Sequence, residues 1–136
     1  MKIIVTGILG QDGANMVEYL LENTSAEIYG MTRRSSNPNF IICNSFISNP
    51  RFNLIYGDLS DSISIDNAVR EIQPDYFINL AAQTFVGSSW DFPAQTWECQ
   101  HQIFHHLRPR KNSCRAWCLW VCASGCHWCI QTARRV

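Results

Sequence analysis

The chain opens with a short apolar run that ends in regularly spaced glycines. The run Lys2–Thr6 is mostly apolar and β-branched, which is typical of a buried parallel strand. Gly7, Gly10 and Gly13 follow as G-x-x-G-x-x-G, and the apolar residues after them recur at helical spacing. A strand, a glycine turn and a helix in this order predict the start of a βαβ unit. Such a turn can bind phosphate through free N–H groups and the helix dipole, or it can simply join the two elements.

The remainder of the first 98 residues alternates between apolar strands and helical segments. The expected strands are 26–31, 51–56 and 75–80, and the expected helices run from an Asp12 cap through Leu21 and from a Ser60 or Ser62 cap through Ile72. Residues 33–50 predict a long loop with a short helix near residues 40–46. This alternation predicts an α/β fold, a Rossmann-like doubly wound parallel sheet that is incomplete, with four clear strands. The expected C-terminal tail is irregular and rich in Cys and Trp, and its apolar run 117–121 can cover an open part of the sheet.

Ligands of such sheets lie beyond the carboxyl ends of the strands. An NAD site usually has a carboxylate after the second strand, but Arg33-Arg34-Ser35-Ser36 stands there instead. Guanidinium groups bind phosphate bidentately, so this segment favours NADP; a solvated basic turn is the alternative. Asp58 either accepts from an adenine amino group or caps the next helix. The small residues after the fourth strand either leave room for the nicotinamide ribose or allow close packing.

Four motifs carry a family resemblance: V-T-G-I-L-G-Q-D-G, M-T-R-R-S-S, Y-G-D-L-S-D-S and I-N-L-A-A-Q-T-F-V-G-S-S-W. In this order they resemble the extended short-chain dehydrogenase/reductases, and within them the GDP-mannose 4,6-dehydratases. The resemblance implies NADP as cofactor, GDP-mannose as substrate, a homo-oligomer and a hydro-lyase reaction that gives GDP-4-keto-6-deoxymannose. It also assigns the pyrophosphate, the 2′-phosphate, the adenine and the nicotinamide half, in that order, to four groups of residues. The implied cofactor contacts are Gly7, Ile8, Leu9, Gly10, Gln11 and Asp12; Arg33, Arg34, Ser35 and Ser36; Asp58 and Leu59; and Leu80, Ala81, Ala82, Gln83 and Thr84.

The acid–base residues of that family do not occur in this sequence. The family uses a tyrosine four residues before a lysine, whose charge lowers the pKa of the phenol. The lysines here are Lys2 and Lys111, and neither follows a tyrosine at that spacing. We therefore assign no catalytic residue and expect a truncated chain that is inactive alone. A non-catalytic NADP-binding module is the alternative.

The composition changes near residue 99. Six of the seven cysteines and all four histidines follow Glu98, but no acidic residue does. We divide the chain into an NADP-binding domain, 1–98, and an aberrant tail, 99–136, and hypothesise that a frameshift produced the tail. The family commonly continues here with Glu-Val-Asn-Thr. Cys99-Gln100-His101 can be encoded TGT CAA CAC, and reading one nucleotide later gives GTC AAC, which encodes Val-Asn, followed by AC, the start of a Thr codon. A zinc-binding tail is the alternative, but the single C-x-x-C at Cys126 is fewer than zinc sites use, and no metal ligand is assigned.

The overall charge argues against two classes of partner. The chain has 11 basic and 11 acidic residues, so charge alone attracts neither nucleic acid nor a membrane surface. No apolar run approaches the roughly 20 residues of a membrane span, and the N-terminus lacks the long apolar region of a secretory signal. We expect a cytoplasmic protein, in which a disulfide framework is disfavoured.

Overall fold

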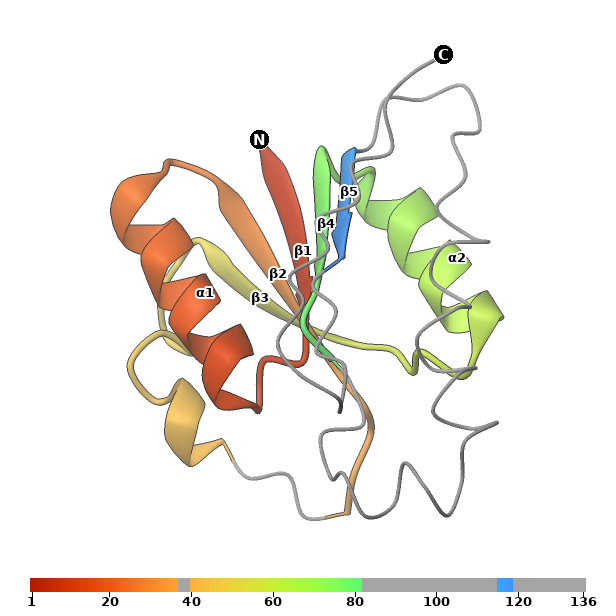
Figure 1. Ribbon diagram of the computed structural model, residues 1–136, viewed down its shortest axis with the longest axis horizontal. Helices are drawn as coiled ribbons and strands as arrows, with labels where there is room; N and C mark the ends of the chain where they lie inside the picture. Colours follow the sequence, from red (N-terminus) through yellow and green to blue (C-terminus); the bar gives the residue numbers. More distant parts are fainter. Residues whose placement is uncertain (37–39, 82–114, 119–136) are drawn as a thin grey trace, which may run out of the picture.

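The computed structural model describes residues 1–36 and 40–81, together with the backbone of residues 115–118. Their strands form one parallel sheet in the order β3-β2-β1-β4-β5 (Figure 1). The elements in chain order are β1 (Lys2–Thr6), α1 (Gln11–Asn23), β2 (Glu27–Thr32), the 3-10 helix η1 (Ile41–Cys43), β3 (Phe52–Tyr56), α2 (Ser62–Ile72), β4 (Tyr76–Asn79) and β5 (Arg115–Cys118).

The two helices cover opposite faces of this sheet (Figure 1). Successive side chains of a strand point to opposite faces. Ile3 and Val5 of β1 accordingly belong to the buried cluster that includes Val17 of α1, whereas Ile4 belongs to the cluster that includes Ile65 of α2. This explains why Ile3, Ile4 and Val5 are all apolar, and it confirms the doubly wound arrangement.

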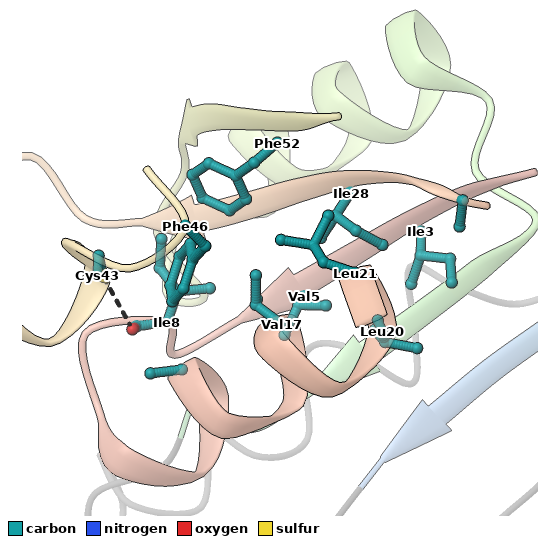
Figure 2. Packing of buried hydrophobic residues seen from close by; sticks show 12 residues of the cluster. Ile3, Val5, Ile8, Val17, Leu20, Leu21, Ile28, Cys43, Phe46 and Phe52 are labelled. Atoms are coloured by element: carbon teal, nitrogen blue, oxygen red, sulfur yellow. Dashed lines mark hydrogen bonds between the residues drawn. The ribbon is translucent and has the colours of Figure 1, made fainter. Parts of the chain in front are cut away.

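The segment between β2 and β3 packs against the α1 side of the sheet. Its predicted short helix is confirmed as η1. Cys43 and Phe46 are buried there, and the rings of Phe46 and Phe52 meet edge to face with centroids 4.9 Å apart. Figure 2 shows these side chains beside Ile8, which follows β1.

The four predicted strands are confirmed within about two residues at each end, but both predicted helix caps are wrong. Gly10 is the N-cap of α1, and Asp12 lies inside the first turn, where a carboxylate still favours the helix dipole. Asp61 caps α2 by accepting from the backbone N–H of Ile63 at 3.1 Å. Ser60 does not cap because its hydroxyl donates to Asp58, and Ser62 is already helical.

Within the described residues the sheet has one strand more than the sequence predicts. β5 pairs in parallel with β4, from Tyr76↔Arg115 to Asn79↔Cys118. β5 therefore covers the edge of β4, and two of its residues, 117 and 118, belong to the apolar run 117–121. The other tail residues, including the C-x-x-C at Cys126 that was considered for zinc, lie outside the described part of the chain. Among the helices that the structure describes, none is long and apolar enough to cross a membrane.

Candidate nucleotide-binding site

The turn between β1 and α1 is built so tightly that two of its glycines cannot carry a side chain. Gly7 has a φ of +73°, the left-handed region, and a Cβ there would lie 2.7 Å from the backbone N of Ala81. A Cβ at Gly13 would lie 2.2 Å from the carbonyl oxygen of Gly7. Gly10 is different, because its Cβ would come no closer than 3.3 Å to a described atom. The sequence pattern thus reflects close backbone approach at Gly7 and Gly13.

The turn leaves the N-terminus of α1 open to a ligand. The first N–H groups of any helix lack an intrahelical partner. At Gly10 no side chain of the described residues caps them, in contrast to Asp61 at α2. Uncapped N–H groups and the positive end of the helix dipole favour an anion such as a phosphate.

Ile8 anchors this turn in the core. Its side chain is fully buried, and its carbonyl oxygen accepts a hydrogen bond from the Cys43 thiol, 3.3 Å away (Figure 2). Burial raises the pKa of Cys43, which keeps the sulfur protonated and able to donate. Since a carbonyl and the following N–H point in opposite directions across a trans peptide, the Leu9 N–H points away from Cys43.

A buried hydrogen-bond network joins the ends of β1 and β4. The Thr6 hydroxyl donates to Oδ1 of Asn79 and accepts from the N–H groups of Leu80 and Ala81, each at 3.2 Å. Both polar side chains are buried, so each needs these partners. The network sets Ala81 beside Gly7. The sequence analysis did not identify Thr6 and Asn79. The sign that could have revealed them is a polar residue at the end of each of two apolar strands, which prove to be neighbours in the sheet.

The predicted 2′-phosphate segment lies at the end of β2. Arg33, Arg34, Ser35 and Ser36 are all exposed. The Arg34 Cζ lies 5.6 Å from the ring centroid of Tyr56, the last residue of β3. The strands stay paired up to this point, because the Gly57 N–H donates to the Thr32 carbonyl at 3.0 Å.

Asp58 follows β3 and organises the turn before α2. Its Oδ1 accepts from the Ser60 N–H at 2.9 Å and from the Ser60 hydroxyl at 2.7 Å. The backbone hydrogen bond from Ser60 is the main reason that the pKa of Asp58 is lowered, with the charge of Arg33 adding to it and burial opposing it. Asp58 is therefore ionised at neutral pH. It closes a local turn, and the helix cap itself is Asp61.

These segments share one edge of the sheet, because carboxyl ends of parallel strands lie together. The structure brings Gly7 next to Ala81, and it brings Arg34 onto Tyr56 beside Asp58. Leu59 packs against the α2 cluster. Ala82, Gln83 and Thr84 lie outside the described residues. Within the part of the chain that is described, no group of three His, Cys, Asp or Glu side chains could hold a metal.

A doubly wound parallel sheet with an uncapped glycine turn after its first strand defines a Rossmann-like nucleotide-binding fold. Solved structures with this architecture include the dTDP-glucose 4,6-dehydratase of Bacillus anthracis in complex with NAD, with a TM-score of 0.68 and 17% identity over 88% of this chain and 36% of that one. DesIV, a dTDP-glucose 4,6-dehydratase of Streptomyces venezuelae with NAD and TYD bound, gives a TM-score of 0.65 and 22% identity over 79% of this chain and 34% of that one. At such identities the likeness shows the fold.

The sequence comparison identifies the family. The family model described as GDP-mannose 4,6 dehydratase matches residues 4–107, so the chain belongs to that family. GDP-mannose 4,6-dehydratase of Yersinia enterocolitica is 42% identical over 100 residues, which are 70% of this chain and 27% of the relative. GDP-mannose 4,6 dehydratase 1 of Arabidopsis thaliana is 42% identical over 99 residues, 68% of this chain and 27% of the relative. The chain thus spans about a quarter of the length of these relatives.

Proposed function

We propose that this chain binds NADP and is the cofactor-binding part of a GDP-mannose 4,6-dehydratase. The observation that carries the choice of NADP over NAD is the end of β2. It presents two exposed arginines and no carboxylate at the position where NAD sites bind the ribose 2′-hydroxyl. A carboxylate there would repel a 2′-phosphate, whereas guanidinium groups pair with it.

The other proposed contacts rest on the family resemblance and on the position of each segment at the carboxyl ends of the strands. The first free N–H groups of α1 face a pyrophosphate, because Gly7 and Gly13 keep side chains out of the turn and no side chain of the described residues caps α1. The Gly10 N–H is not one of them, since it donates to the Gly7 carbonyl at 2.9 Å. Asp58 accepts from the adenine amino group and Leu59 lies beside the ring. Residues 80–84 line the nicotinamide half. Bound NADP supplies a hydride acceptor for C4 of the mannose of GDP-mannose.

The proposed role of residues 1–136 is to hold the cofactor. The tyrosine–lysine pair that removes the hydroxyl proton in this family is not among them. We therefore expect the chain to bind NADP without converting GDP-mannose by itself. The boundary at residue 98, a cytoplasmic location and a homo-oligomer remain predictions.

Binding is tested by fluorescence titration of the full chain with NADPH and NADH. Each charge-assisted hydrogen bond to the 2′-phosphate contributes about 1.5–3 kcal/mol, so Arg33→Ala with Arg34→Ala should weaken NADPH binding by about tenfold or more. NADH binding should not change. Arg70→Ala is the matched control, because Arg70 is also exposed but lies in the last turn of α2. An unchanged NADPH-to-NADH preference in the double variant would refute the 2′-phosphate assignment.

A further inference from the structure

Tyr56 is an aromatic residue that the core does not require. It ends β3 opposite Thr32 of β2, its side chain is 51% exposed, and it belongs to neither buried cluster. Its one ring contact in the described structure is with Arg34, whose Cζ lies 5.6 Å from the ring centroid. Burial in the core therefore does not explain an aromatic ring at this position. Its contact with the guanidinium of Arg34 does.

The contact with the Tyr56 ring leaves Arg34 able to bind an anion. A guanidinium is planar and carries its five N–H donors in that plane. The face of an aromatic ring attracts the positive charge of the guanidinium, and this attraction does not use the N–H donors at the edge of the guanidinium. Tyr56 can therefore hold the side chain while the edge of the guanidinium makes bidentate hydrogen bonds to a phosphate. Because Arg has several rotatable bonds, prior contact with the ring lowers the entropy lost on binding.

The two arginines of the segment differ in their surroundings. The charge of Arg33 contributes to the lowered pKa of Asp58, so Arg33 lies within electrostatic reach of that carboxylate. Arg34 instead has a neutral ring as its partner, which leaves its charge uncompensated by that contact. We propose that Tyr56 positions Arg34 for the 2′-phosphate and thereby sets the preference for NADP over NAD. This inference rests on the proposed function and adds a positioning residue to it.

The test compares Tyr56→Leu with Tyr56→Phe in the full chain. Leu removes the ring and keeps an apolar side chain, whereas Phe keeps the ring. A cation–π contact at an exposed site corresponds to about a two- to fivefold change in affinity. Tyr56→Leu should weaken NADPH binding by that factor and leave NADH binding unchanged, and Tyr56→Phe should retain the wild-type preference. In an Arg34→Ala background, Tyr56→Leu should have no further effect.

Two outcomes of the nucleotide titrations overturn the inference alone while wild-type NADPH binding stands. One is an equal loss of NADPH and NADH affinity in Tyr56→Leu, which would mean that the ring contacts a shared part of the nucleotide. The other is additivity of Tyr56→Leu and Arg34→Ala. A nucleotide-free measurement checks the contact itself: NMR should show ring-current shifts of the Arg34 δ protons that disappear in Tyr56→Leu, and their absence in the wild type would also overturn it. Failure of the wild type to bind either nucleotide would instead refute the proposed function and, with it, this inference.

Discussion

Replacing Gly13 with alanine should damage the turn, although alanine favours helices. The added Cβ would lie 2.2 Å from the Gly7 carbonyl oxygen, 2.6 Å from the Gly7 carbonyl carbon and 2.9 Å from the Ile8 Cα. Ordinary contact begins at 3.4 Å, so the turn must move by about 1 Å. All three atoms belong to the backbone, and Ile8 is anchored in the core, so rotation of a side chain cannot relieve the contact.

The energy balance sets the expected result. Overpacking of this kind costs about 3 kcal/mol at the upper end, and the change from Gly to Ala in a helix returns about 1 kcal/mol. Gly13→Ala should therefore lower the free energy of unfolding by about 2 kcal/mol in urea titrations. Affinity for NADPH and NADH should fall together by about tenfold or more, because the N–H groups that we propose to bind the pyrophosphate would move.

Gly10→Ser is the matched control in the same turn. A Cβ at Gly10 meets the Gly7 oxygen at 3.3 Å, the φ of −93° suits any residue, and serine is a favourable N-cap. Its unfolding free energy should stay within about 0.5 kcal/mol of the wild type. If Gly13→Ala proved as stable as Gly10→Ser, or more stable than the wild type, helix propensity would outweigh the contact and the argument for a close-packed turn would be refuted.

Two further predictions concern stability away from the turn. Arg51 donates to the carbonyls of Leu21 and Thr24 at the end of α1, so Arg51→Ala should lower the free energy of unfolding by about 1–3 kcal/mol in urea titrations. Arg51→Lys should recover only part of this loss, because one ammonium group cannot reproduce the two hydrogen bonds of the guanidinium, and full recovery would contradict this prediction. Burial, followed by the hydrogen bond to Glu27 and its charge, raises the pKa of Tyr29 to about 12, so the neutral phenol stabilises the fold below pH 10 and this stabilisation is lost as the pH rises from 10 to 12. Urea midpoints of the wild type and Tyr29→Phe should diverge in that window, and parallel curves would contradict the pKa shift.

Strands were predictable here because burial on both faces leaves a continuous apolar run. Ile3, Ile4 and Val5 are all fully or nearly fully buried, although they contact different helices. Helix caps were less predictable. Asp58, Ser60, Asp61 and Ser62 are all favourable capping types within one turn of chain, and their mutual hydrogen bonds decide which one caps.

The rest of the site depends on which strands are neighbours. Thr6 and Asn79 share a hydrogen bond only because β1 and β4 pair, and Arg34 reaches Tyr56 only because β2 and β3 pair. The chain also gives no local sign that Cys43 supports the turn at Ile8, 35 residues away in sequence. Glycine spacing and the paired arginines predict the kind of ligand, whereas the groups that hold these residues in place follow from the sheet order.

The family match extends past the predicted frame change after Glu98. A single inserted base would place every later residue out of the family frame, yet the family match extends from residue 4 to residue 107. A frame change directly after Glu98 therefore does not by itself explain why the family match includes residues 99–107. Sequencing the coding DNA through codons 97 to 102 tests the hypothesis, because a frameshift predicts one inserted base after the Glu98 codon. An intact frame through these codons would refute the frameshift and make the Cys-rich tail, β5 included, a genuine part of the protein.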